Sequence, residues 1–368
     1  MENFFGFDPR TLSQSDGTAV SAANQTIYKC NPKNSISEDG HYRAIIKVMY
    51  NPFSFKDSVI EKQSYSMNDE NGWFDAVSCL TNGDKNCPIF KAWKALRYSK
   101  DPVKESWAAP KSKGGKGWFD KRSERFVTIQ VIEDKNQPEL EGRYMLWKLP
   151  KFIQTLIDGK QSPSIESGKP SIPVMDLLLG RAIELDVTPG PDDKNDPSRK
   201  QREISYDLSA LTEEPVQCTM PDGSSLITDE QQEIVDRVIG LLKKTWKERD
   251  VKKRAELMQE FAASDDVKKF NEFYGNEVLP KVQSFCPNVK EEMSFKPWDD
   301  EKTARVNAWL SKVTNGIDPE IPSIGASVTG IEPAAAERET AAAPDLNAII
   351  NPVQSDTEAS DSDDDLPF

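Results

Sequence analysis

The stretch Cys87–Ile132 reads CPIFKAWKALRYSKDPVKESWAAPKSKGGKGWFDKRSERFVTIQVI, and it ends in the clearest strand pattern of the chain. In its last seven residues, Phe126–Ile132, branched hydrophobic side chains occupy every second position, which is the period of a β-strand. Upstream of this strand, the segment Lys91–Arg125 holds eleven Lys or Arg residues against four Asp or Glu. The sequence therefore places a strongly basic segment directly before a strand of the core.

Aromatic residues are interleaved with these cations. Cations can follow the phosphates of a single-stranded nucleic acid while flat rings stack on its unpaired bases, so the pattern favours a surface that binds single strands. The alternative is a solvated basic face whose aromatic side chains belong to the core. The rings concerned are Trp93, Tyr98, Trp107, Trp118, Phe119 and Phe126.

Further strands are predicted on both sides of this stretch. The segment Tyr42–Tyr50 alternates, which would put Arg43 and Lys47 on a basic outer face. Several short strands that share a basic, aromatic face fit a five-stranded oligonucleotide-binding (OB) barrel. We therefore predict an α+β chain with an OB-fold core over residues 25–225. The other candidate strands are Trp73–Leu80, Arg143–Leu149, Arg181–Val187 and Arg202–Leu208.

Helical patterns accompany and follow these strands. Pro88 suits the first position of a helix, and residues 102–117 after it read as a long polar loop. Farther along, Thr228 and Gln231 have the spacing of a capping box, and four helices are expected over residues 226–315, as a subdomain packed on or beside the barrel. The basic residues that the first helix leaves for solvent or ligand are Lys91, Lys94 and Arg97.

The acidic residues of the chain are concentrated away from the basic stretch. The 368 residues carry a formal net charge of -14, and from Glu339 to the end there are eight Asp or Glu and no Lys or Arg. We expect residues 1–24 to be a flexible arm and residues 316–368 to be a disordered linker with an acidic tip, because their composition cannot bury enough surface to fold.

Composition also excludes several classes of protein. No stretch approaches ~18 consecutive apolar residues, which argues against a membrane span. The start, MENFFGFDPR, does not read as a secretory signal. Five cysteines at scattered spacing fit a reduced cytoplasm better than a disulfide scaffold.

The chain ends Asp361-Ser-Asp-Asp-Asp-Leu-Pro-Phe368, which resembles the C-terminal tip of bacterial single-stranded DNA-binding proteins. In such a tip the apolar side chains can fill a small pocket, the terminal carboxylate can meet a cation, and the aspartates steer it to a basic rim. The alternative is a solubilising acidic tail. The expected partner-binding residues are Asp363, Asp364, Asp365, Leu366, Pro367 and Phe368.

A set of short segments recurs in a consistent order through the body of the chain: YRAIIKVMYNP from Tyr42, Asn71-Gly72 leading to Cys79, Cys87-Pro88 before a basic helix, Lys121-Arg122 before a strand, and the turn Pro138–Gly142. Through these segments the body, from about Tyr28 to about Lys281, resembles the helix-destabilising single-stranded DNA-binding protein of T-even phages. That resemblance implies an OB core that binds single-stranded DNA in a basic, aromatic cleft, and an acidic C-terminal region that contacts other replication proteins.

Two features depart from this family. Its zinc site uses one His and three Cys, but here only Cys79 and Cys87 match, while Phe90 and Ser66 stand where ligands are expected. Two thiolates alone do not make a structural zinc site, so we predict no zinc and no other cofactor. The family's basic N-terminal cooperativity segment is also reduced, to Arg10 and its neighbour.

The sequence thus predicts a non-enzymatic protein of phage DNA replication, recombination and repair, which coats single-stranded DNA without reading its sequence in the cytoplasm of an infected bacterial host. The tip would recruit replication and recombination proteins such as a polymerase, a helicase or primase, and recombinase loaders. No membrane partner is expected. The predicted DNA-binding residues are Arg43, Lys47, Lys91, Trp93, Lys94, Arg97, Tyr98, Lys111, Lys113, Lys116, Trp118, Phe119, Lys121, Arg122, Arg125, Phe126, Lys148, Arg199 and Lys200.

Two other functions are open at this point. One is an interaction protein that uses a host-like tip to recruit host replication factors and binds no DNA itself. The other is a metal-dependent nuclease, although no spaced Asp/Glu motif and no pair of histidines supports it, since His41 is the only histidine.

Overall fold

The computed structural model describes residues 27–69, 72–109, 114–115, 119–162, 169–189 and 204–314. Within them the chain forms a mixed α+β structure around a nine-stranded sheet, in the order β1-β6-β5-β2-β7-β8. Off this path, β3 pairs with β5, β4 pairs with β3, and β9 pairs with β7. In this part of the chain the sheet is not closed into a barrel. No helix of the described residues has the length and apolar character needed to cross a membrane.

The strands and helices follow one another in a mixed order. The strands are β1 (Ile27–Tyr28), β2 (Tyr42–Met49), β3 (Ile60–Asp69), β4 (Gly72–Val77), β5 (Phe119–Glu133), β6 (Tyr144–Lys148), β7 (Arg181–Pro189), β8 (Ile204–Ser205) and β9 (Ala210–Pro215). The helices are α1 (Pro88–Arg97), α2 (Pro102–Ala108), α3 (Lys151–Gln161), α4 (Asp229–Lys247), α5 (Val251–Ala263), α6 (Asp265–Phe273), α7 (Leu279–Gln283), α8 (Val289–Met293) and α9 (Asp300–Thr314).

Strand β5 is the longest strand and changes partners along its length. Its first half pairs antiparallel with β3, from Phe119 to Phe126. Its second half pairs with β2 on one edge and β6 on the other, where Ile129 lies opposite both Val48 and Met145. The predicted strand Phe126–Ile132 is thus confirmed as the second half of a longer element.

Both faces of the second half of β5 are buried. Val127, Ile129 and Val131 belong to one hydrophobic cluster, which α3 completes with Ile153 and Ile157. The polar residues between them, Thr128 and Gln130, are buried as well. Gln130 donates to the carbonyl oxygens of Gly142 and Thr219 and accepts from the Thr219 amide, so its polar atoms are satisfied inside the core.

A second hydrophobic cluster joins the sheet to a group of helices. It combines Met49, Tyr144 and Leu177–Leu179 with side chains of α4, α6 and α7. Helix α4 begins at the predicted capping box, in which Thr228 and Gln231 bond each other's backbone, a motif worth about 1 kcal/mol. A π-helical turn, Tyr274–Val278, joins α6 to α7.

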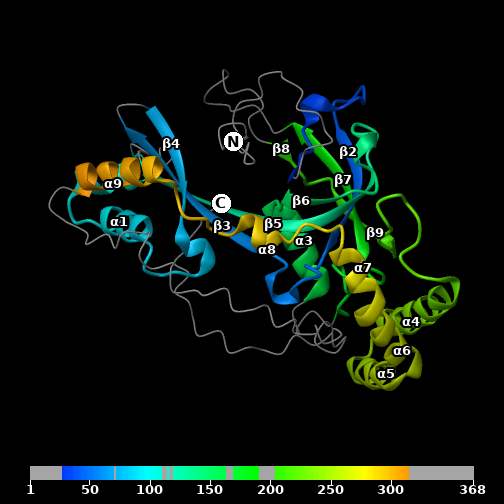
Figure 1. The fold of residues 1–368 in the computed structure, drawn as a ribbon. Helices are drawn as coiled ribbons and strands as arrows, with labels where there is room; N and C mark the ends of the chain where they lie inside the picture. The colour runs from blue at the N-terminus through cyan, green and yellow to red at the C-terminus, as the bar shows by residue number, and fades with distance from the viewer. Residues whose placement is uncertain are drawn as a thin grey trace.

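The remaining elements form what we call the side unit: β3, β4, the first half of β5, α1, α2 and α9. Its cluster contains Tyr65 of β3, Phe119 of β5, Ile89 and Leu96 of α1, and Trp309 of α9. Figure 1 shows α1, α9 and β4 at one end of the molecule and α4, α5 and α6 at the other. Of the four helices expected together, α9 therefore packs apart from the other three.

The chain reaches the side unit from the helices by a short connection. Phe295 exchanges hydrogen bonds with the Asn82 side chain, at 2.8 Å and 3.2 Å. Trp298 donates its indole N–H to the Val77 carbonyl at 3.2 Å. On the way, Val289 and Met293 of α8 cover Phe126. These contacts fix the C-terminal part of the described chain against the sheet.

Several sequence predictions need correction. The expected loop 102–117 contains α2, because Asp101 caps it by accepting from the Val103 amide at 2.9 Å. The strand expected over Trp73–Leu80 ends at Val77, and a 3-10 turn begins at Cys79. The strand expected over Arg202–Leu208 is reduced to β8, and β9 follows it. Strand β3 was not predicted, because its polar run EKQSYS lacks a hydrophobic alternation.

Candidate nucleic-acid interface

Helix α1 and the residue that ends it carry three neighbouring rings. Phe90 and Trp93 are one turn apart and stack, with centroids 6.5 Å apart and planes 17° from parallel. Tyr98 meets Trp93 edge-on at 6.4 Å and is 67% exposed. The helix has this amphipathic form because Ile89, Ala92 and Leu96 face the core of the side unit.

A lysine from the sheet completes this group. The Lys121 ammonium lies 5.4 Å from the Trp93 ring centroid and 5.9 Å from that of Phe90. Such a cation over an aromatic face is worth about 0.5–1 kcal/mol at an exposed site. We call Phe90, Trp93, Tyr98 and Lys121 the aromatic patch.

Tyr65 of β3 supports the aromatic patch from below. Its buried ring lies 6.2 Å from Trp93 and 5.2 Å from Phe119, and it sits opposite Lys121 in the β3–β5 register. The Tyr65 hydroxyl and the Trp93 indole N–H are buried and have no hydrogen-bond partner among the described residues. A buried polar group without a partner costs about 1–3 kcal/mol, so these two atoms make the packing beneath the patch less stable than full pairing would.

Two exposed lysines flank the patch on α1. Lys91 and Lys94 are both exposed, and the Lys91 ammonium donates to the Asn86 side chain at 3.1 Å. Arg97 on the same helix is less available, because it pairs with Glu105 of α2 at 2.7 Å. Helix α1 thus offers positive charge beside its rings, as the sequence indicated.

Other predicted cations, on β5 and the neighbouring β6, are held in what we call the ion-pair ladder. Arg122 lies 3.7 Å from Asp75 and 3.8 Å from Asp120. Arg125 lies 3.5 Å from Glu61 and also donates to Gln154, and Lys148 of β6 lies 2.5 Å from Glu124. A phosphate would therefore compete with carboxylates for these three cations.

Three predicted contact residues are buried. Lys47 is 0% exposed, and Phe119 and Phe126 lie in the hydrophobic clusters described above. The two rings are covered because α9 packs on Phe119, with Trp309 at 4.7 Å, and α8 packs on Phe126. None of the three can reach a nucleic acid in this conformation.

Lys47 is buried because the segment 174–180 and the helices beyond it cover that face of β2. Its ammonium donates to the Val174 carbonyl at 3.4 Å. Burial lowers the pKa of Lys47 to about 8. The electrostatic interactions with Cys218 and Asp176 act in the other direction and offset only part of this shift. A Cβ at Gly180 would lie 2.3 Å from the Val174 carbonyl oxygen and 2.5 Å from both the Asp176 carbonyl oxygen and the Lys47 ammonium, so the two backbone carbonyls require a glycine here.

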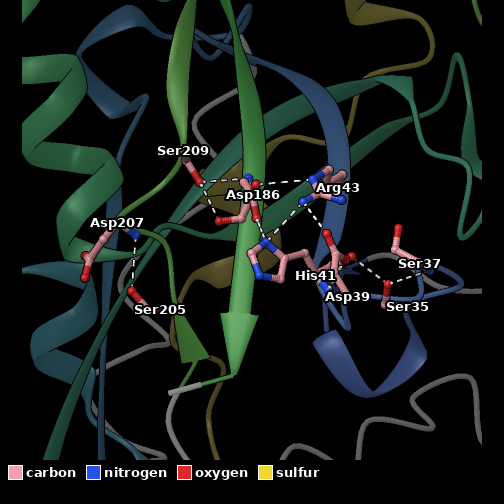
Figure 2. A network of polar contacts seen from close by, with 9 residues as sticks. All are labelled: Ser35, Ser37, Asp39, His41, Arg43, Asp186, Ser205, Asp207 and Ser209. Atoms are coloured by element: carbon pink, nitrogen blue, oxygen red, sulfur yellow. Dashed lines mark hydrogen bonds and ion pairs between the residues drawn. The ribbon is translucent and has the colours of Figure 1, made fainter. Parts of the chain in front are cut away.

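Arg43 lies away from the aromatic patch, in a network with the only histidine. It donates to Asp39 at 2.6 Å and to Asp186 of β7 at 3.2 Å, while His41 lies 2.8 Å from Asp186 (Figure 2). Figure 2 also shows Ser209 beside Asp186, where its hydroxyl accepts from the Asp186 amide at 3.1 Å. Two carboxylates thus balance Arg43, which makes this a less suitable phosphate site than α1.

Some predicted residues lie outside the described part of the chain. They are Lys111, Lys113, Lys116, Trp118, Arg199, Lys200, and the tip residues Asp363, Asp364, Asp365, Leu366, Pro367 and Phe368. The structure therefore leaves their roles as predictions.

The residues that match the family's zinc site do not fit the metal. Cys79 and Cys87 both pack in the hydrophobic cluster of the side unit, but Ser66 lies on β3 as a buried hydroxyl and Phe90 belongs to the aromatic patch. Among the described residues, no three His, Cys, Asp or Glu side chains gather as metal ligands. The chemistry of this donor set fits a thiol pair better than a zinc ion; that zinc is absent stays a prediction.

Sequence reasoning missed the contribution of Phe90 and Tyr65 to this surface. Phe90 was interpreted only as filling the place of a ligand, although its spacing of three from Trp93 on a helix could have identified it as a neighbouring ring. Tyr65 had no such signal, because the strand that carries it was not predicted.

In comparisons with known proteins, the chain matches no family model, and no curated protein resembles it at a significant level.

Proposed function

We propose that this protein coats single-stranded DNA without reading its sequence, and that the aromatic patch and the adjacent lysines of α1 are the central part of its binding surface. The observation that carries the proposal is the arrangement of Phe90, Trp93 and Tyr98 beneath and beside Lys121. Rings of this kind stack on any base, and the surrounding ammonium groups attract any phosphate.

The sheet supports the proposal at the level of the fold. The path β6-β5-β2-β7-β9 contains five strands, the number of an OB barrel, although the pair that would close it is lacking among the described strands. We propose that this path is an OB-like core and that the side unit is built onto it through β5.

The acidic C-terminal end completes the proposed function. The tip Asp363–Phe368 would dock on polymerase, helicase or primase, and recombinase loaders, in phage DNA replication, recombination and repair inside an infected bacterium. Binding alone, without a catalytic step or a cofactor, accounts for this role.

The test is intrinsic tryptophan fluorescence during titration with oligo(dT) at two salt concentrations. We expect saturable quenching that weakens steeply with salt, with a slope near -4 if about six phosphates are neutralised. The double variant Lys94→Gln/Lys121→Gln should reduce that slope by about 1.4. Lys135→Gln is the matched control, because Lys135 is exposed at the far end of β5.

Two outcomes would count against the proposal. If neither quenching nor retention of labelled DNA occurs, the protein does not bind DNA and the tip becomes its main functional element. If binding occurs but the double variant has the slope of Lys135→Gln, the DNA lies on another surface.

A further inference from the structure

A second cluster of cations lies at the opposite end of the molecule from the aromatic patch. The segment 243–254, which covers the end of α4 and the start of α5, holds seven Lys or Arg against two Asp or Glu, in a chain whose formal net charge is -14. Figure 1 shows α4 and α5 at the end of the molecule away from α1. We call the exposed cations of this segment the basic corner: Lys244, Lys247, Arg249, Lys252 and Lys253.

The two carboxylates of the segment already accept hydrogen bonds from the backbone. The Asp250 side chain caps α5 by accepting from the Lys252 and Lys253 amides, at 2.9 Å and 3.0 Å. The Glu248 side chain accepts from the Asp250 amide at 2.8 Å. The Arg254 guanidinium braces the same turn, because it donates to the Glu248 carbonyl at 3.0 Å. The polar groups of the turn therefore fix its shape and leave the basic corner unneutralised.

The stability of the two helices does not explain all of these cations. Within the described chain, no salt bridge or side-chain hydrogen bond holds any cation of the basic corner. Lys244 and Lys247 lie in the last turn of α4, where the helix dipole favours positive charge. Lys252 and Lys253 lie in the first turn of α5, where the dipole disfavours positive charge. A bound anion would offset both this effect and the mutual repulsion of the five cations.

The basic corner lacks the free rings of a surface that stacks on unpaired bases. Trp246, the one ring in the segment, is half-buried against the two main hydrophobic clusters. Its indole N–H donates to the Ser171 carbonyl at 3.1 Å, and the Arg181 guanidinium lies 5.6 Å from its ring centroid. Duplex DNA keeps its bases inside and presents one negative charge per roughly 1.7 Å, so a surface for it needs cations and no rings.

An acidic peptide is the other polyanion that could bind here, and the C-terminal tip of this chain is an example. Such a peptide binds through apolar side chains in a pocket as well as through its charge. A pocket between α4 and α6 has Ile234 and Phe273 in its wall, but three glutamates and a single lysine line it as well. In the segment 243–254, Val251 is the only large hydrophobic side chain that is well exposed. The surface therefore fits phosphates better than an acidic peptide.

We propose that the basic corner binds the phosphates of duplex DNA, on a surface separate from the aromatic patch. Its contacts are with the backbone alone, so this surface reads no sequence. One molecule would then contact an open strand at α1 and the adjoining duplex at the α4–α5 turn, a consequence that rests on the proposed function. Binding of the duplex itself does not depend on it.

The test is the fluorescence anisotropy of a short, labelled, blunt-ended duplex titrated with the full chain over a series of salt concentrations. If about four phosphates are neutralised, the logarithm of the affinity should fall with that of the salt concentration with a slope of about -3.6. Lys247→Gln/Lys252→Gln/Lys253→Gln should bring this slope to about -0.9 and leave quenching by oligo(dT) nearly unchanged. Replacing the same three lysines by arginine should keep the slope of wild type, because a phosphate attracts either cation.

A matched control removes the same charge from exposed positions elsewhere. Lys29→Gln/Lys135→Gln/Lys160→Gln should keep most of the slope for the duplex, because none of these lysines lies at the basic corner. The variant of the aromatic patch, Lys94→Gln/Lys121→Gln, should also bind the duplex as wild type does. The two surfaces would thus be separated by substitutions that each affect one form of DNA.

Four results would overturn the proposal: no binding of the duplex at low salt, an equal loss of slope in the control variant, an equal loss of oligo(dT) affinity in the corner variant, or binding at the corner of a synthetic peptide of residues 356–368 but not of the duplex. The third would make the corner part of the single-strand surface, and the fourth would make its partner an acidic peptide. If wild type binds the duplex but not oligo(dT), the proposed function fails while the duplex result stands.

Discussion

The two halves of β5 are continuous in sequence, but one half is largely accessible to solvent and the other is buried. The half that pairs with β3, from Phe119 to Arg125, presents charged side chains to solvent and contributes Lys121 to the aromatic patch. The half from Phe126 to Val131 is buried on both faces. The division lies where the pairing partner of β5 changes from β3 to β2. The neighbouring strands, and the helices and loops that cover them, therefore determine which half can bind a ligand.

The sharpest test of this comparison is to truncate one side chain to alanine in each half. Ile129→Ala should lower the free energy of unfolding by about 2–5 kcal/mol, because Ile129 is fully buried in the cluster with α3. Arg122→Ala, in the exposed half, should change it by less than about 0.5 kcal/mol. Chemical denaturation measures both. Similar losses would show that the first half of β5 is part of the same core.

The second prediction concerns a buried cation on β2, the strand that pairs with the buried half of β5. Lys47 lies opposite Gln130, and its folded pKa of about 8 is below the 10.5 of an unfolded lysine. Between pH 8 and pH 10.5 the unfolded chain therefore binds more protons than the folded one. The free energy of unfolding rises with pH through that window, because the buried Lys47 loses its charge. A difference of 2.5 pKa units corresponds to about 3 kcal/mol.

The measurement compares wild type with Lys47→Met in denaturant titrations from pH 7 to pH 10.5. Asp176 and Cys218, the titratable groups that face Lys47, remain in both proteins, so their contributions largely cancel. We expect the stability of wild type to rise relative to the variant by about 3 kcal/mol across the window. Parallel curves would mean that water reaches Lys47 and that its side of the sheet is not sealed.

These residues also show how far sequence could predict the molecule. The strand Phe126–Ile132 and the capping box of α4 were found because their signals are local. The burial of Lys47, Thr128 and Gln130 was not, because that face of the sheet is covered by residues more than forty positions away, such as Val174 and Thr219. An alternating strand identifies two faces, but it does not say whether the second one meets solvent.

The residues of the candidate site also differ in whether local sequence or distant packing determines their exposure. Lys91 and Lys94 were placed correctly at the surface, since a single amphipathic helix determines their positions. Phe119 and Phe126 were expected to stack on bases but are covered by α9 and α8, which come more than 150 residues later. For such rings the sequence gives the residue type, and only the tertiary fold gives its exposure.

The third prediction concerns the ring that remains most exposed. Tyr98→Ala should weaken oligo(dT) binding by about 1–3 kcal/mol, the value of one stacked base, and leave the stability within about 0.5 kcal/mol of wild type. Leu208→Ala removes a side chain of comparable exposure away from α1 and serves as the control. Equal affinities for the two variants would remove Tyr98 from the binding surface.

The smallest expected effect tests whether the ion-pair ladder restrains binding by the exposed half of β5. Glu124 holds Lys148 at 2.5 Å, and exposed pairs of this kind contribute only about 0.2–1 kcal/mol. Glu124→Gln should therefore change stability little, while it frees Lys148 for a phosphate and raises oligo(dT) affinity at low salt. Glu133→Gln makes the same change of charge on the same strand, at the end where Glu133 pairs with Lys135, and it should leave affinity nearly unchanged. An equal gain in the two variants would mean that DNA responds to net charge alone, whereas a gain confined to Glu124→Gln would show that carboxylates of the ladder compete with phosphate for the same cations.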